Sequence, residues 1–171
     1  MILDLLLLNA WGKRSEREAL ARDVLGRARA KGLMIVTAES CTGGLVSAAL
    51  TEIAGSSDVF DRGFVTYSNG AKTGQLGVDP GLISQHGAVS EPVAAAMAEG
   101  ALARSDAGLA VSITGIAGPG GGTTEKPVGL VCFGIARRGG ATVAETKRFG
   151  PRSRRYVRAE AAMHALRLLR V

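Results

Sequence analysis

The sequence predicts an α/β protein of one domain, built on a mixed and mostly parallel β-sheet with helices on both faces. Segments with helical periodicity alternate with short apolar runs along most of the chain, which is typical of strands joined by helical crossovers. Two apolar runs near the C-terminus have no helix between them, so an antiparallel pair is expected there. The chain has 171 residues, 46% of them hydrophobic and 21% charged, which suffices for one complete core and excludes disorder as its main state.

The first expected helix covers Ser15–Arg29, because Ser15 and Glu18 have the spacing of a capping box. Residues 1–14 are interpreted as an N-terminal extension of a domain that covers 15–171. The leucine run in this extension is too short to span a bilayer, and no basic segment precedes it. We therefore expect a cytoplasmic protein with no membrane partner.

Three further elements are expected before the middle of the chain. Residues 33–38 are continuously apolar apart from one threonine and predict a buried strand. A helix over about 39–53 follows, and then a short strand over Phe64–Tyr67. Ser68 or Asn69 can cap the helix that comes next.

The second half of the chain begins with a helix from Glu91 to about Arg104. Ser90 is in the position of its cap, and Pro92 falls in the first turn, where a missing N–H costs nothing. Leu109–Ile113 is again continuously apolar and predicts a buried strand. The remaining expected elements are, in order, an irregular loop over Gly115–Pro127, a strand pair over Val128–Ala136 and Thr142–Phe149, and a helix over about Arg154–Leu169.

Charge is unevenly distributed. The chain carries a net charge of +6, but residues 137–171 alone carry +8, so that the rest of the chain sums to −2. A basic C-terminal segment can contact phosphate. Aromatic residues make up only 4% of the chain and no DNA-binding motif is present, so nucleic acid is not the expected partner.

The cysteines and histidines predict neither a disulfide framework nor a metal centre. Cys41 and Cys132 are far apart in sequence, and only His86 and His164 could join them as zinc ligands. No metal or other cofactor is expected. His86 could in principle belong to a Ser-His-Asp triad, but its Gln-His-Gly surroundings indicate a loop histidine.

The first candidate site is a strand-to-helix turn with the sequence AESCTGG, residues 38–44. The Ser40 hydroxyl would lie at the carboxyl end of the sheet, where open α/β sheets bind ligands. Free N–H groups at the start of the following helix would suit an oxyanion or a phosphate. The simpler alternative is that Ser40 or Thr42 only caps the helix.

A second polar turn, YSNGAK at residues 67–72, has the same strand-to-helix context. Tyr67 and Lys72 could therefore point into the same crevice as Ser40. A lysine among apolar neighbours loses its proton more readily and can serve as the base for a serine. The simpler alternative is a solvated surface lysine.

Two further segments are candidates for binding. The glycine-rich loop after the strand at 109–113 matches neither a phosphate-binding P-loop nor a dinucleotide-binding fingerprint, yet a loop of this length is typical of a site. Arg152 and Arg154 lie near the start of the last helix, where cations are poorly placed unless an anion binds. A solvated basic face is the alternative.

The motifs TAESCTGG (37–44), GSSDVFDRGFVTYSNGAK (55–72), GAVSEPVAAAMAEGA (87–101) and TGIAGPGGGTTEKPVG (114–129) together carry a family resemblance. The chain resembles the CinA C-terminal domain family, whose stand-alone members are nicotinamide-nucleotide amidohydrolases. The resemblance covers nearly the whole chain. It implies a three-layer α/β/α fold and deamidation of nicotinamide mononucleotide to nicotinate mononucleotide and ammonia, in pyridine-nucleotide salvage.

The resemblance also implies roles for individual residues. Ser40 matches the family's nucleophile and Lys72 its base, and Tyr67 is expected as a third catalytic residue that relays a proton or holds the substrate ring. The phosphate-binding arginine corresponds to Arg154 when positions are counted back from the matching Val-Arg pair, and to Arg152 when they are counted from Gly150. The residues expected to bind the substrate are Thr42, Gly43, Thr114, Gly115 and Arg154.

Two functions from different classes follow. The first is a metal-independent amidohydrolase that acts on a small nucleotide and is expected to form a homodimer. The alternative is a competence- or DNA-damage-associated protein that binds nucleic acid through its basic end and has no enzymatic activity.

Overall fold

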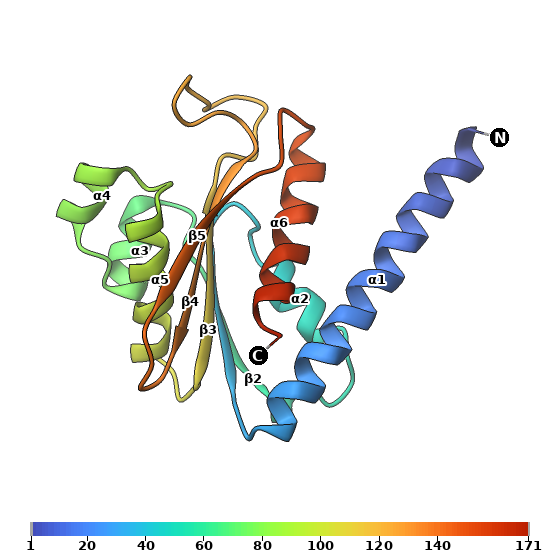
Figure 1. Cartoon of the computed structure of the whole chain (residues 1–171), viewed down its shortest axis with the longest axis horizontal. Helices are drawn as coiled ribbons and strands as arrows, with labels where there is room; N and C mark the ends of the chain where they lie inside the picture. The colour runs from blue at the N-terminus through green and yellow to red at the C-terminus, as the bar shows by residue number, and fades with distance from the viewer. Residues whose placement is uncertain (1, 171) are drawn as a thin grey trace.

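The structure, a computed structural model, describes residues 2–170, with side chains from residue 15 onward, and shows a five-stranded sheet between two layers of helices (Figure 1). The strand order is β2-β1-β3-β4-β5. β1 pairs in parallel with β2 and β3, whereas the pairings of β3 with β4 and of β4 with β5 are antiparallel. The strands are β1 (Ile35–Glu39), β2 (Phe60–Val65), β3 (Leu109–Gly115), β4 (Leu130–Arg137) and β5 (Val143–Arg148). The predicted three-layer α/β/α fold with a mixed sheet is confirmed.

Each face of the sheet is covered by its own group of helices. Figure 1 shows α1, α2 and α6 on one face and α3, α4 and α5 on the other. The helices are α1 (Ile2–Ala30), α2 (Leu45–Thr51), α3 (Asn69–Leu76), α4 (Pro80–His86), α5 (Glu91–Ala103) and α6 (Arg154–Leu168), and a 3-10 turn covers Ser56–Asp58. No helix among the described residues has the length and apolar character needed to cross a membrane.

The core is correspondingly divided by the sheet. Leu25, Leu50 and Phe133 belong to the cluster beneath α1, α2 and α6. Leu76 and Met97 belong to the cluster beneath α3, α4 and α5. Because the central strands are buried on both faces, they read in the sequence as continuous apolar runs, which is why β1 and β3 could be predicted.

The first helix differs from its prediction. It begins at Ile2 rather than at Ser15, so Ser15 lies inside the helix and the capping-box interpretation is wrong. Residues 2–14 contain mostly leucine, alanine and basic residues, which have high helix propensity and continue the helix toward the N-terminus. The boundary expected between 14 and 15 therefore falls within one continuous helix.

The second helix is shorter than predicted. It begins at Leu45, and residues 40–44 form a turn in which Gly43 and Gly44 adopt φ values of 60° and 96°. This left-handed backbone is the conformation that glycine adopts at little cost. Neither Ser40 nor Thr42 is the helix cap; that position belongs to Gly44.

The remaining elements agree with the sequence more closely, with two exceptions. Ser68 caps α3 through its side chain, and Pro92 lies in the first turn of α5, as predicted. The strand predicted over 64–67 is instead Phe60–Val65, because this edge strand is half exposed and lacks a continuous apolar run. No helix was predicted at α4, which ends at His86, although Asp79 caps it and Pro80 lies in its first turn.

The sheet register gathers the ends of three strands at one edge. Glu39, the last residue of β1, pairs with Val65 of β2 and with Ile113 of β3. These three parallel strands therefore end together, as ligand-binding edges of open α/β sheets do. The residues that follow them begin with Ser40 after β1 and Thr66 after β2.

Candidate active site

Ser40 and Lys72 meet at this edge of the sheet. Ser40 follows β1 directly, and Lys72 lies in the first turn of α3, which the Ser68 cap fixes after β2. Lys72 Nζ lies 3.0 Å from Ser40 Oγ and donates a second hydrogen bond, also of 3.0 Å, to the carbonyl oxygen of Thr66. A separation of about 2.6–3.2 Å is the reach of a general base on its nucleophile.

Lys72 is almost completely buried, with 2% of its surface exposed. Burial disfavours the ammonium form and lowers the pKa of Lys72 below its usual value, while the nearby Cys41 opposes this shift. Among the described residues, no carboxylate forms a salt bridge with this side chain. Deprotonation of Lys72 to the neutral amine therefore costs less free energy than deprotonation of a lysine on the protein surface.

The pair opens into a small pocket of about 220 Å³. Its walls come from loops after all three parallel strands, from α3 and from α6. The residues predicted for the site that line it are Ser40, Tyr67, Lys72, Thr114, Gly115 and Arg154. Thr42 and Gly43, predicted to bind the substrate, do not line it.

Further residues line the pocket that were not predicted from the sequence. Asn69 lies in the polar turn before Lys72, and that turn could have indicated it. Ala88 and Val89 come from the segment before α5, and their small apolar side chains carry no chemical signal. Their place is set by Thr114, whose hydroxyl donates a 2.8 Å hydrogen bond to the carbonyl of Ala88.

The structure separates the two candidate arginines. Arg154 lines the pocket, and its guanidinium donates to Tyr67 Oη over 2.7 Å and to the carbonyl of Gly118 over 3.0 Å. Arg152 instead lies over the ring of Tyr156, with its guanidinium 5.8 Å from the ring centre. The pocket therefore contains Arg154, the residue selected by counting back from the Val-Arg pair.

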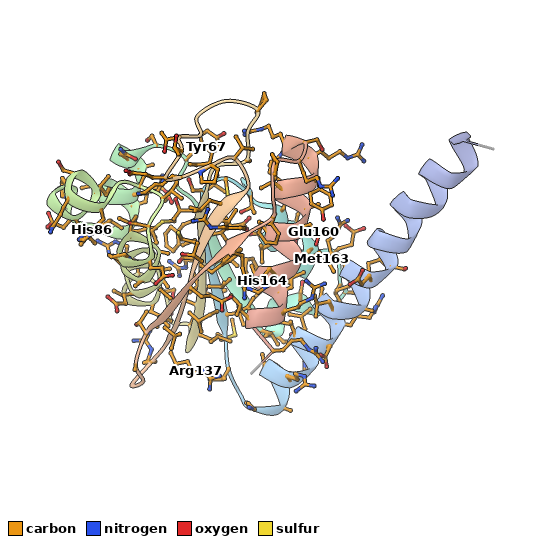
Figure 2. All side chains as sticks on the ribbon, turned by 45° about the horizontal axis from the view of Figure 1, so that its top comes forward. Tyr67, His86, Arg137, Glu160, Met163 and His164 are labelled. Carbon is orange, nitrogen blue, oxygen red and sulfur yellow. The ribbon has the colours of Figure 1, made fainter. Side chains whose placement is uncertain are left out.

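Tyr67 lies at the rim of the pocket, with 62% of its surface exposed. Figure 2 shows it beside the glycine-rich loop. Its hydroxyl oxygen accepts a hydrogen bond from Arg154 and not from Lys72. Its position suits contact with a bound molecule and support of the arginine more than proton transfer at the serine.

The N-terminus of α2 is not available to a ligand in the way expected from the sequence. The Glu39 carboxylate accepts hydrogen bonds from the N–H groups of Gly44, Val46 and Ser47, at 2.9–3.1 Å. These are the N–H groups predicted to face an oxyanion or a phosphate. That expectation is wrong for them, because an acidic residue preceding Ser40 satisfies the helix end itself.

Cys41 is adjacent to Ser40 and also lines the pocket. Burial raises the pKa of its thiol to about 12. The nucleophilic form of cysteine is the thiolate, so this thiol is a poor nucleophile at neutral pH. The hydroxyl of Ser40 remains the better candidate.

Neither His86 nor a metal site contributes to the pocket. Figure 2 shows His86 on the α4 side of the molecule, and it does not line the pocket. Within residues 15–170, no group of three or more His, Cys, Asp or Glu side chains is placed to hold a metal ion.

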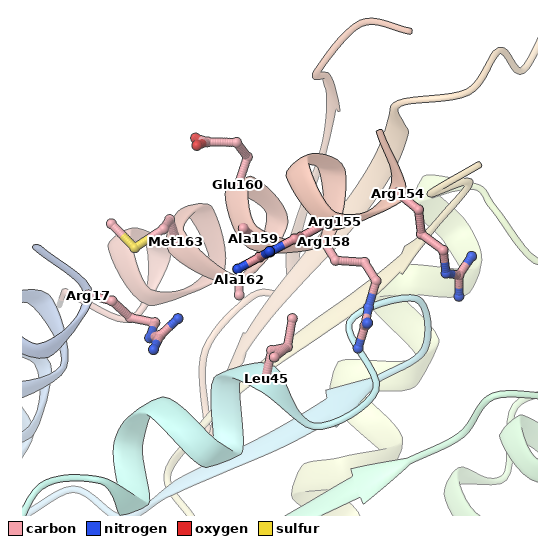
Figure 3. A pocket seen from close by; sticks show the side chains of 9 residues that line it. All are labelled: Arg17, Leu45, Arg154, Arg155, Arg158, Ala159, Glu160, Ala162 and Met163. Atoms are coloured by element: carbon pink, nitrogen blue, oxygen red, sulfur yellow. The ribbon is translucent and has the colours of Figure 1, made fainter. Parts of the chain in front are cut away.

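A larger basic groove of about 610 Å³ lies beside the pocket, between α1, α2 and α6 (Figure 3). Arg154 lines both cavities, so they adjoin at this side chain. The groove is also lined by Arg17, Arg155 and Arg158. Part of the positive charge of the C-terminal segment is therefore located in this groove.

Comparison with protein families gives one match that covers most of the chain. The model of the CinA C-terminal domain matches residues 17–171. A CinA-like protein of Mycolicibacterium vanbaalenii is 59% identical over 139 residues, which are 81% of this chain and 33% of that protein. The nicotinamide-nucleotide amidohydrolase PncC of Enterobacter agglomerans is 52% identical over 138 residues, 81% of this chain and 84% of that protein. The chain thus spans about a third of the length of the CinA-like relatives and most of the amidohydrolase.

Solved structures show the same fold. A competence/damage inducible protein, CihA, of Agrobacterium tumefaciens superposes with a TM-score of 0.88 at 51% identity, covering 90% of this chain and 93% of that one. The competence damage-inducible protein A of Klebsiella pneumoniae superposes with a TM-score of 0.86 at 36% identity, with coverage of 90% and 94%.

Proposed function

The chain belongs to the CinA C-terminal domain family, and from this we propose that it hydrolyses the amide of nicotinamide mononucleotide to nicotinate mononucleotide and ammonia. The observation that carries the proposal is the contact of 3.0 Å between Lys72 Nζ and Ser40 Oγ at a pocket wall. The amidohydrolase relative, of which the chain covers 84%, supports this choice of reaction. Such a reaction belongs to pyridine-nucleotide salvage.

In the first half of the proposed reaction, Ser40 is the nucleophile. The neutral amine of Lys72 takes the Ser40 proton as Oγ bonds to the carboxamide carbon. The Lys72 ammonium then gives that proton to the amide nitrogen. The carbon–nitrogen bond breaks, ammonia leaves, and Ser40 carries the nicotinoyl group as an ester.

In the second half, water attacks the ester and displaces Ser40 from the acyl carbon. Lys72, neutral again, takes a proton from the attacking water, and the ester bond to Oγ breaks as the proton passes to Ser40. The product leaves as the carboxylic acid, which loses its proton to the solvent, and the resting pair is restored. The low exposure of Lys72 supports both halves, because each needs the neutral amine as the acceptor.

Arg154 is the proposed phosphate ligand. It lines the pocket of Ser40 and also the basic groove, so a nucleotide with its amide at Ser40 can direct its phosphate toward this guanidinium. The hydrogen bonds of Arg154 to Tyr67 and Gly118 hold the guanidinium in place before substrate binds. Arginine is well suited to phosphate because its donors match two oxygens at once.

The test is direct. Purified protein is incubated with nicotinamide mononucleotide, and release of ammonia is followed with time alongside formation of nicotinate mononucleotide. We expect equal amounts of the two products, without added metal. Absence of ammonia, together with binding of double-stranded DNA at physiological salt, would favour the nucleic-acid-binding alternative.

A further inference from the structure

The turn that carries Ser40 is held by two charged side chains that do not line the pocket. Glu39, immediately before Ser40, has no exposed surface. Its carboxylate accepts from the N–H groups of Gly44, Val46 and Ser47, and from the Ser47 hydroxyl at 2.8 Å. All four donors belong to the end of the turn or the first turn of α2, so Glu39 joins the start of the turn to the helix that follows it.

Arg158 holds the same turn from a distant part of the sequence. It projects from α6 toward the segment that precedes α2 (Figure 3). Its guanidinium donates from Nε to the carbonyl of Cys41 over 3.1 Å and from Nη2 to the carbonyl of Thr42 over 2.9 Å. These are the two carbonyls that directly follow Ser40, and a planar guanidinium fixes both at once.

Fixing these carbonyls also fixes the N–H groups of the turn. In a trans peptide the N–H points opposite to the C=O of the same unit. Because Arg158 binds the Cys41 carbonyl, the Thr42 N–H points away from Arg158. The Gly43 N–H donates to the carbonyl of Ser40 over 3.0 Å, so the turn is also closed by its own backbone.

We propose that Glu39 and Arg158 are positioning residues for the reaction, which rests on the proposed role of Ser40 as nucleophile. Together they keep Ser40 Oγ within hydrogen-bond distance of Lys72 Nζ. The N–H groups at the start of α2 that Glu39 binds thus hold the turn of Ser40 in place rather than bind a ligand.

The experiment compares Arg158→Ala and Arg158→Lys with the matched control Arg155→Ala. Arg155 is three residues away on the same helix and lines only the basic groove. The first readout is the rate at which a small fluorophosphonate modifies Ser40, followed by mass spectrometry. The second is kcat and KM for release of ammonia from nicotinamide mononucleotide. The third is the recovery of both rates when guanidinium is added at concentrations well below those that unfold the protein.

We expect Arg158→Ala to lower the modification rate and kcat by about tenfold to a hundredfold with little change in KM, since small displacements of a reacting group have effects of this size. Added guanidinium should restore part of both rates in Arg158→Ala and do nothing in Arg155→Ala, which should behave as wild type. Arg158→Lys, which retains one charged donor, should be intermediate, and it carries the test if Arg158→Ala does not fold.

Two results would overturn the inference. The first is an unchanged rate of Ser40 modification in folded Arg158→Ala or Arg158→Lys. The second is a loss of activity that guanidinium does not relieve and that appears as a change in KM instead of kcat. The modification assay also separates this inference from the proposed substrate. If wild-type protein releases no ammonia but Ser40 reactivity still depends on Arg158, the substrate is wrong and the positioning role stands. If wild-type Ser40 is not modified at all, the nucleophile and the positioning role both fall.

Discussion

Replacing Lys72 with methionine removes the amine that lies 3.0 Å from Ser40 Oγ while keeping an unbranched side chain in a site with 2% exposure. A positioned general base contributes about 10²–10⁴-fold to a rate, so we expect kcat for ammonia release to fall at least about a hundredfold. That loss corresponds to about 2.7 kcal/mol of transition-state stabilisation. Circular dichroism checks the fold, and Lys31→Met, a change at an exposed lysine, is the matched control.

The pH dependence of kcat tests the role of Lys72 as the base independently. The active form of Lys72 is the neutral amine, so wild-type kcat should rise with pH through the lowered pKa of Lys72 and then level off. A variant that keeps more than about a tenth of wild-type kcat would refute the role of base. A wild-type profile that stays flat between about pH 6 and 9, with the chemical step shown to be rate-limiting, would refute it equally.

Lys72→Met should also change stability with a defined sign. The folded-state pKa of Lys72 is lowered, whereas an unfolded chain has the ordinary lysine value of about 10.4. Between the two values the unfolded state binds more protons, so wild-type stability rises with pH across that window. The variant lacks this term, and its Tm should exceed that of wild type at neutral pH by more than it does near pH 10. An equal difference at both pH values would show that folding does not lower the pKa of Lys72.

Three further predictions concern the other pocket residues. Ser40→Ala should abolish ammonia release and leave the fold intact by circular dichroism; retention of more than about a tenth of the wild-type rate would exclude Ser40 as the nucleophile. Cys41→Ala should retain activity at neutral pH, because the thiol pKa of about 12 keeps it protonated; a loss comparable with that of Ser40→Ala would reverse the assignment. Arg154→Ala should lower kcat/KM for nicotinamide mononucleotide at least about tenfold and leave the riboside, which lacks the phosphate, nearly unchanged, since a charge-assisted contact contributes roughly 1.5–3 kcal/mol. Arg152→Ala is the control for Arg154→Ala, and equal losses on the two substrates would remove Arg154 from the phosphate site.

The sequence by itself predicted most of the elements of this protein and several of the residues that line the candidate site. β1 and β3 are buried on both faces and therefore appear as apolar runs. Ser68 and Pro92 mark the starts of α3 and α5 through local backbone chemistry that needs no tertiary contact. Ser40 and the YSNGAK turn could be selected because each follows a strand and its residue types suit acyl transfer.

Local pattern was a poorer guide where an element is half exposed or where two local signals compete. The edge strand β2 lacks an apolar run, so its start was predicted four residues too late. The capping box at Ser15 is a real spacing, but helix formers on its N-terminal side override it. The helix predicted from residue 39 begins only at Leu45, because two glycines with positive φ separate it from the strand.

Only the tertiary structure decided how the charged side chains are used. Tyr67 and Arg154 are 87 positions apart, and Arg158 binds carbonyls up to 117 positions away in the sequence. Such contacts depend on how α6 packs over the sheet edge, whereas periodicity and capping report only on neighbours a few residues apart. For the same reason the sequence left Arg152 and Arg154 as alternatives, and it placed an oxyanion or phosphate at helix N–H groups that the folded chain gives to Glu39.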